Sequence, residues 1–142
     1  MPVGDHCTTK VATARPDATI RELASRMDAE DTGCVVIVDE QHRPIGIVTD
    51  RDIALRVLRR RRNADATLAS DVMTEHPIRV RALTPIATAL RRMNGEGVRR
   101  VPVIGDGGRL VGLFSIDAAL RAIANEVGAL ASVAEAQRTA SA

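Results

Sequence analysis

Two side chains three residues apart, Thr49 and Asp52, are the clearest candidates for chemistry. They lie where a Val-rich stretch gives way to a helical pattern, so the Thr49 hydroxyl can cap that helix. A phosphate fits the same position, because free backbone N–H groups and the helix dipole favour an anion. Asp52 faces the same side, and a carboxylate can accept both hydroxyls of a ribose. A helix cap and a nucleotide site are therefore both open interpretations of this pair.

Nearly the same segment occurs again 66 positions further along, since Gly46 to Asp52 matches Gly112 to Ala118. The same offset, without a gap, also pairs Asp5 with Asp71. One period with two copies predicts a pseudo-two-fold pair, because a solenoid needs about three units to bury a continuous core. Features that the copies share therefore belong to the fold, and features that differ point to what each copy binds.

The second copy departs from the first at the position of the acid. Ser115 keeps the hydroxyl, but Ala118 stands where the first copy has Asp52. Asp117 lies one residue early, about 100° away around the helix. We therefore expect the cleft beside Ser115 to be weaker, to be empty or to take another ligand. Drift in an unused site is the simpler interpretation.

Hydrophobic periodicity places these residues on short strands and helices. In the first copy it predicts a helix over 20–27 capped by Asp17 or Thr19 and ended by Gly33, strands over 34–38 and 45–48, and a helix from Asp50. In the second copy it predicts strands over 78–80, 101–104 and 110–114 and helices over 85–93 and 117–127. The boundaries are a repeat over 5–62, a linker over 63–70, a repeat over 71–127 and an Ala-rich tail over 128–142 with weak helical character.

Composition excludes several classes of function. The 142 residues are 45% hydrophobic, enough for a core, and the net charge of +2 implies no strong electrostatic partner. The longest apolar run, 34–38, is far too short for a membrane span. Two cysteines without metal-ligand spacing and no recognisable signal peptide indicate a cytoplasmic protein with reduced thiols. No metal site is expected, and without a nucleophile–base pair we predict that the chain is not an enzyme.

The repeat resembles the cystathionine-β-synthase (CBS) domain, of which two in tandem form a Bateman module. Segments 46–52 and 97–103 carry the resemblance, which covers roughly Asp5 to Asn125. It implies an α/β (α+β) fold of two pseudo-two-fold-related repeats, each a small, mostly antiparallel sheet with two packed helices. It also implies two clefts between the copies that bind AMP, ADP, ATP, NAD or S-adenosylmethionine, and pairing of modules into a disc-shaped homodimer.

The same resemblance places the ligand on named residues. In the first copy these are Thr13, Ala14, Cys34, Val35, Thr49, Asp50, Arg51 and Asp52. The second, weaker cleft takes Val80, Arg100, Val101 and Ser115. Arg99 or Arg100 can reach a phosphate as a charged fork, or either can be a surface residue or part of an interface ion pair. The adenine nucleotide is a ligand, and no obligatory cofactor is expected.

Three functions remain. The leading hypothesis is a stand-alone regulatory module that binds an adenine nucleotide and signals to an unknown partner protein. The alternative is a ligand-independent dimerisation or interaction module, which the loss of the acid at Ala118 favours. The third is nucleic-acid binding through Arg59 to Arg62. It is the weakest, because cations commonly end a helix and the chain has few aromatic residues to stack on bases.

Overall fold

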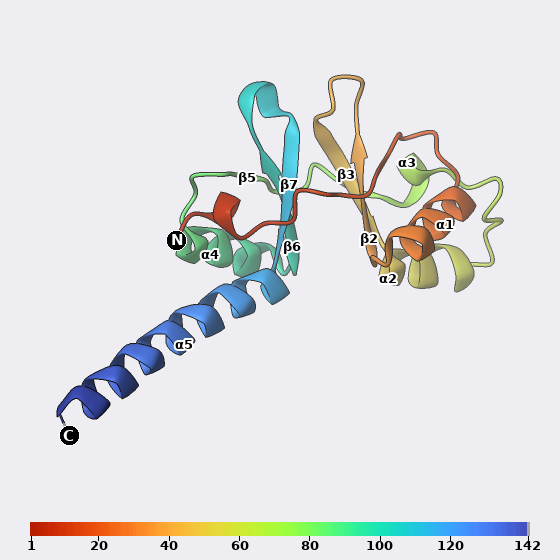
Figure 1. Ribbon diagram of the computed structural model, residues 1–142. Helices are drawn as coiled ribbons and strands as arrows, with labels where there is room; N and C mark the ends of the chain where they lie inside the picture. Colours follow the sequence, from red (N-terminus) through yellow and green to blue (C-terminus); the bar gives the residue numbers. More distant parts are fainter. Residues whose placement is uncertain (142) are drawn as a thin grey trace.

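Two small sheets stand side by side in the computed structural model, which describes residues 1–141 (Figure 1). The first half of the chain forms η1 (Val3–Asp5), β1 (Thr13–Ala14), α1 (Ile20–Glu30), β2 (Cys34–Val38), β3 (Pro44–Thr49), α2 (Asp50–Ile53) and the π-helical turn η2 (Ala54–Leu58). The second half forms α3 (Ala69–Val72), β4 (Thr74–Glu75), β5 (Val80–Arg81), α4 (Ile86–Glu96), β6 (Arg100–Ile104), η3 (Asp106–Gly108), β7 (Leu110–Ser115) and α5 (Ile116–Ser141). The predicted order of a short strand, helix, two strands and helix is confirmed in both copies.

Each sheet has the same internal order. β1 runs parallel to β2, which is antiparallel to β3, and β5, β6 and β7 repeat that pattern. The register is conserved too, because Cys34 lies opposite Thr49 just as Arg100 lies opposite Ser115. The predicted fold class, two pseudo-two-fold-related α/β (α+β) repeats, is confirmed.

The repeats exchange their leading segments, which the sequence pattern did not indicate. Thr74 of β4 pairs with Ile47 of β3, so the second copy extends the sheet of the first. Thr8 of the first copy pairs in turn with Leu113 of β7 in the second sheet. The Thr8 amide donates to the Leu113 carbonyl at 2.9 Å, and the Thr8 carbonyl accepts from the Leu113 amide at 2.8 Å. An open sheet edge exposes unpaired backbone groups, and the exchange covers one edge of each sheet. Neither copy is therefore complete without the other.

Three apolar clusters hold the fold together. The first repeat packs around Leu23 and Val48, and the second packs around Phe114 and Met93, all nearly or fully inaccessible. A smaller cluster that includes Val36 of β2 joins the two repeats, with side chains from β7 against it. Because β2 is buried along its whole length, the prediction of a fully buried strand over 34–38 is confirmed.

The ends of α1 illustrate how local chemistry sets boundaries. Thr19 is the cap, since its hydroxyl accepts from the Glu22 amide at 3.2 Å while Glu22 accepts from the Thr19 amide at 3.1 Å. The expectation that Gly33 ends the helix is wrong, because Asp31 already takes the left-handed conformation with φ of 50°. A glycine is instead needed at position 33 because Asp50 lies close to it. A Cβ at Gly33 would lie 2.7 Å from an Asp50 carboxylate oxygen.

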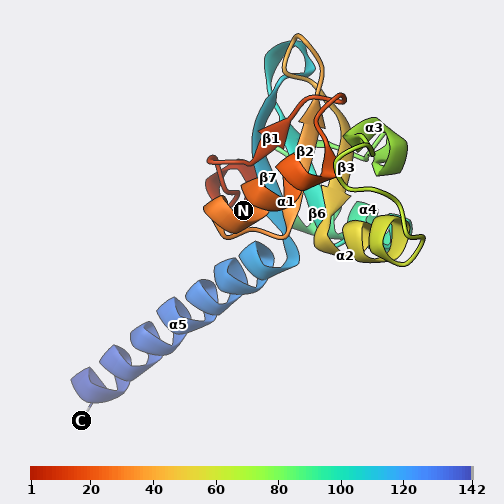
Figure 2. The same cartoon turned by 90° about the vertical axis from the view of Figure 1, so that its right-hand side faces the viewer.

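The largest difference from the sequence-based expectation is α5. A helix ending at Val127 was predicted, but α5 continues without a break to Ser141. Alanine is the strongest helix former, and the Ala-rich run carries the helix past Gly128 despite the cost of a glycine inside a helix. The extension leaves the two sheets and projects outward in both views (Figures 1 and 2). Among the described residues, no helix is long and apolar enough to cross a membrane.

Candidate functional site

The first strand-to-helix junction is closed by its own side chains. The Thr49 hydroxyl accepts a hydrogen bond from the Asp52 amide at 3.2 Å, and an Asp52 carboxylate oxygen accepts from the Thr49 amide at 2.9 Å. Asp52 also lies 3.8 Å from Arg56 in an ion pair. The helix-cap interpretation of this pair is confirmed, while its role in holding a ribose stays a prediction.

The second junction uses the hydroxyl alone. The Ser115 hydroxyl accepts a hydrogen bond from the Ala118 amide at 3.1 Å, so the cap is kept. Ala118 itself is buried in the core of the second repeat, where no carboxylate would be tolerated without a partner. Asp117, one residue earlier and turned around the helix, lines the cleft instead. The rotation of Asp117 around the helix therefore turns its carboxylate toward this cleft, and the expectation that the cleft is weaker, empty or takes another ligand stays a prediction.

A cavity of about 550 Å³ lies between the two repeats beside Ser115. Its walls come from the segment 8–12 that precedes β1, the end of α1, the starts of β2 and β6, and the junction of β7 with α5. The lining residues are Thr8, Lys10, Val11, Ala12, Ala29, Glu30, Asp31, Thr32, Cys34, Arg100, Leu113, Ser115, Asp117 and Arg121. Because both copies contribute, this cleft exists only while the repeats are packed together.

Three cations give the cleft its electrostatic character. Lys10, Arg100 and Arg121 all line it, and none of them takes part in an ion pair within residues 1–141. The cleft also adjoins the N-terminus of α5, where the helix dipole favours an anion. Three acids line the same cleft, Glu30, Asp31 and Asp117, and Glu30 is paired with Arg26 at 2.7 Å. The cleft therefore offers cations that suit a phosphate and carboxylates that suit hydroxyl groups.

Cys34 and Arg100 occupy equivalent positions in the two repeats and meet in this cleft. Burial raises the pKa of the Cys34 thiol to about 11, since a thiolate would be poorly solvated there. The positive charge of Arg100 acts in the opposite direction, and the carboxylates of Asp52 and Asp50 raise this pKa further. The thiol is therefore neutral and unreactive at physiological pH. Cys34 packs in its buried strand as a small hydrophobic residue.

The predicted site residues divide into four groups in the structure. Cys34 of the first predicted cleft lies together with Arg100 and Ser115 of the second, so the structure combines residues assigned to separate clefts. Buried in the cores are the side chains of Val35, Val80 and Val101. Strand β1 consists of Thr13 and Ala14, and Ala14 lines another hollow. The β3–α2 junction holds Thr49, Asp50, Arg51 and Asp52.

Sequence reasoning missed Asp117, Lys10 and Arg121 as cleft residues. The repeat itself held the signal for Asp117, because the offset of 66 places it at the position of Arg51, which was a predicted ligand residue. Lys10 and Arg121 had no such signal, since neither belongs to the repeated motif. Their place depends on the packing of the two copies.

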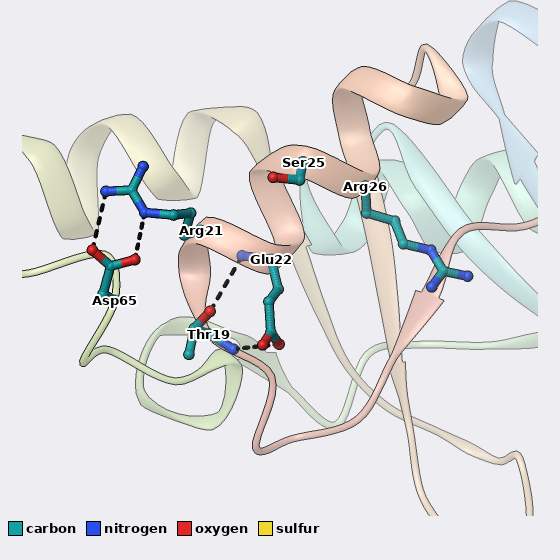
Figure 3. Close-up of a pocket in the computed structure, with 6 residues that line it drawn as sticks. All are labelled: Thr19, Arg21, Glu22, Ser25, Arg26 and Asp65. Atoms are coloured by element: carbon teal, nitrogen blue, oxygen red, sulfur yellow. Dashed lines mark hydrogen bonds and ion pairs between the residues drawn. The ribbon is translucent and has the colours of Figure 1, made fainter.

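A second hollow lies on the outside of the first repeat and offers less (Figure 3). Both of its cations are already paired, Arg21 with Asp65 and Arg26 with Glu30. Thr19 and Glu22 form the cap of α1, and Arg21 is paired with Asp65 of the linker through two of its nitrogens. This hollow has no unpaired cation directed at a ligand. Within residues 1–141, no cluster of His, Cys, Asp and Glu is placed to hold a metal ion.

Comparison with known proteins identifies the class. The family model described as the CBS domain matches residues 3–59 and again 69–125. The chain therefore belongs to the CBS domain family and carries two copies in tandem. This agrees with the pseudo-two-fold fold and with a cleft built from both repeats.

Particular relatives share most of the chain. The CBS domain-containing protein YhcV of Bacillus subtilis is 36% identical over 125 residues, which are 87% of each protein. A Methanopyrus kandleri protein is 34% identical over 116 residues, 82% of this chain but only 59% of the length of that protein. Among solved structures, a CBS domain protein from Pyrobaculum aerophilum complexed with AMP has a TM-score of 0.79 at 28% identity, covering 91% of this chain and 99% of that one.

Proposed function

We propose that this protein is a regulatory module that binds an adenine nucleotide in the cleft between its repeats and signals to a separate partner protein. The observation that carries the proposal is the cleft beside Ser115, which combines three unpaired cations with three carboxylates, one of them Asp117 at the start of a long helix. A relative with the same fold, from Pyrobaculum aerophilum, is complexed with AMP.

The lining residues suggest how a nucleotide would lie. Asp117 can accept the ribose hydroxyls, because a carboxylate offers several lone pairs. Arg100 and Arg121 can bind phosphate oxygens, Arg by a bidentate fork. Apolar side chains, Val11 and Leu113 among them, can cover the base. The cavity falls within the usual range of about 300–1,000 Å³ for small-molecule sites.

Regulation would follow from the construction of the cleft. Since the cleft needs both repeats in place, a ligand would stabilise one arrangement of them over others. The shift can be no larger than the difference in the ligand's affinity for the two arrangements. The partner would then bind the arrangement that the ligand favours. AMP, ADP, ATP, NAD and S-adenosylmethionine are all candidates, and the proposal assigns no catalysis to the chain.

One observation favours the alternative, a ligand-independent interaction module. Thr49 and Asp52 satisfy each other in a cap, so the motif has a structural purpose without any ligand. If that purpose were the whole role of the motif in both repeats, nucleotides would change neither the melting temperature nor partner binding.

Thermal unfolding against a panel of AMP, ADP, ATP, NAD, S-adenosylmethionine and GTP separates the two. A ligand at about 100 times its Kd adds roughly 2.7 kcal/mol to stability, which for a domain of this size is several degrees. We expect one adenine ligand to raise Tm and GTP not to do so. The absence of any shift across the panel would reject the nucleotide proposal in favour of the interaction module.

A further inference from the structure

Both repeats also line a cavity of about 340 Å³ between their two hairpins. The β2–β3 and β6–β7 hairpins extend on the side of the sheets away from α5 (Figures 1 and 2). The Leu110 amide donates to the His42 carbonyl at 2.8 Å, which joins one hairpin to the other. We call this cavity the hairpin pocket, and its lining includes Asp39, Arg43 and Ile45 of the first repeat and Arg79, Gly107 and Gly108 of the second.

The hairpin pocket lies at the opposite end of the central strands from the nucleotide cleft. Cys34 and Arg100, which line the cleft, are the first residues of β2 and β6. Asp39, which follows β2 directly, and Ile104, the last residue of β6, line the hairpin pocket. The two sites share no lining residue, so a ligand in one would not displace a ligand in the other.

Two arginines from different repeats line the pocket, and they are held differently. Arg43 is fixed, because its Nε donates to the Asp39 carboxylate at 2.8 Å. The same carboxylate accepts from the amides of Arg43 and Gln41, both at 2.9 Å, and the bond from the Arg43 amide is the main reason why the pKa of Asp39 lies below its ordinary value. Arg79 is exposed and takes part in no ion pair within residues 1–141. The pocket therefore combines a positioned and an unpaired guanidinium with an acid whose charge is already balanced.

Two consecutive glycines leave room for a ligand beside these arginines. Gly107 and Gly108 have φ of 68° and 76°, a conformation that residues with a side chain rarely adopt. A Cβ at Gly107 would meet no atom within 4 Å, so the space there is open. A Cβ at Gly108 would lie 3.7 Å from Cδ of Arg43, so the arginine of the first hairpin packs onto the second hairpin.

The repeat provides an internal control for this pocket. At the offset of 66 residues, Arg79 matches Thr13 and Asp39 matches Gly105. The equivalent corner of the molecule therefore has neither the unpaired cation nor the acid that fixes the first arginine. Because both copies adopt the same fold, folding alone does not account for residues that only one corner carries.

We propose that the hairpin pocket binds a phosphate group through Arg43 and Arg79. The planar guanidinium matches the spacing of phosphate oxygens, and two of them suit a doubly charged phosphate better than a singly charged carboxylate. A volume near the lower end of small-molecule sites suits free phosphate or a small phosphate ester. The inference does not depend on the function proposed above, since it concerns other residues.

Two-dimensional amide NMR spectra of the isotope-labelled full chain test this proposal, with sodium phosphate titrated against sodium chloride of equal ionic strength. The amide signals of Gly107 and Gly108 should shift until they saturate. Arg79→Thr, which introduces the residue of the first copy, should weaken phosphate binding about tenfold or more. Arg81→Thr is the matched control, because Arg81 is exposed on the same segment without lining the pocket, and it should leave binding unchanged. Since Arg79 is exposed, the dispersed spectrum of the folded chain should persist in the variant.

Three results would overturn the proposal: no saturable shift at the two glycines, equal weakening by Arg79→Thr and Arg81→Thr, or the same shifts with sodium acetate. Phosphate that enters the nucleotide cleft instead would move the amide signals of Ser115 and Asp117 and would be insensitive to Arg79→Thr, which keeps the two sites distinguishable. A parallel titration with glycerol 3-phosphate identifies the source of the phosphate group. Binding of both compounds supports a phosphate ester as the ligand, and binding of inorganic phosphate alone supports the free anion.

Discussion

The two strand-to-helix junctions, β3 to α2 and β7 to α5, share a backbone plan but place their acids differently. In the first repeat the acid, Asp52, stands at the third helical position and closes a cap with Thr49. In the second repeat the acid, Asp117, stands one residue earlier and lines the cleft between the copies. The fold requires a hydroxyl at the cap, which both junctions have. The position of the acid is therefore free to serve the fold in one copy and a ligand in the other.

The helices that follow the junctions differ in the same way. In the first repeat the helix ends in a π-helical turn at Leu58, after which Arg61 takes the left-handed conformation with φ of 55°. In the second repeat α5 runs for 26 residues. Both helices leave apolar side chains exposed, Leu58 on the first and Ile123 on the second among them. The cleft is built from both copies, but only the second junction contributes its acid to it.

The largest effect is expected in the cores. Phe114 and Val48 are equivalent positions, and both are completely buried. Phe114→Ala should cost about 3–5 kcal/mol of unfolding free energy, because it leaves a large cavity. Val48→Ala removes fewer buried methyl groups and should cost clearly less. Urea unfolding of the two variants measures the difference, and an equal loss would contradict the expectation that Phe114→Ala leaves the larger cavity.

The next largest effect is expected on nucleotide binding, when the charge of an arginine inside the cleft is reversed and compared with the same change outside it. Arg100→Glu should weaken nucleotide binding about tenfold to a hundredfold, since a charge-assisted hydrogen bond contributes roughly 1.5–3 kcal/mol. Arg99→Glu is the matched control, because the neighbouring Arg99 is exposed and does not line the cleft. Titration calorimetry measures both affinities. Equal losses would mean that net charge, and not the cleft, determines binding.

Gly46 and Gly112 are equivalent positions at which the leading segment of the other copy lies against a sheet strand. A Cβ at Gly112 would lie 2.6 Å from the Cys7 sulfur and 3.0 Å from the backbone oxygen of Thr8. The three atoms nearest to a Cβ at Gly46 all belong to the side chain of Met73, which is flexible and can move away from this close contact. Gly112→Ala should therefore cost about 1–3 kcal/mol, and Gly46→Ala less. Thermal unfolding checks the order, and the reverse order would contradict the exchange described for these edges.

The smallest effect concerns Cys34. The folded chain holds this thiol at a pKa of about 11, above its ordinary value of 9.0, so it keeps a proton that the unfolded chain loses. The contribution of Cys34 to stability should therefore decline as the pH rises from about 9 to about 11. Urea unfolding across this range, with Cys34→Ala as the reference, measures it. Identical pH slopes for the two proteins would show that burial does not perturb this thiol.

Much of the fold could be predicted from the sequence because the repeat provides two independent views of one pattern. The buried run at 34–38 and the cap at Thr19 follow from local residue chemistry. The exchange of leading segments could not be predicted, since it depends on which sheet edges lie open after packing. The end of α5 was missed because alanine favours the helix throughout this segment and no residue in it marks where the helix stops.

The site was predicted less completely for a related reason. The motif located Thr49 and Ser115 at helix starts, which is a local property. Which residues share one cleft is a property of how the copies pack, and this brought Cys34 beside Arg100. The direction of Asp117 depends on the rotation of α5 relative to the core, which Ala118 fixes by being buried.

Titration calorimetry of AMP into the wild-type chain, Asp117→Ala and Asp52→Ala tests the central claim most directly. The account predicts binding by the wild-type chain, a loss of about tenfold or more in Asp117→Ala, and little change in Asp52→Ala beyond a lower Tm from the weakened cap. Binding that survives in Asp117→Ala and disappears in Asp52→Ala would contradict the account and place the nucleotide at the first junction.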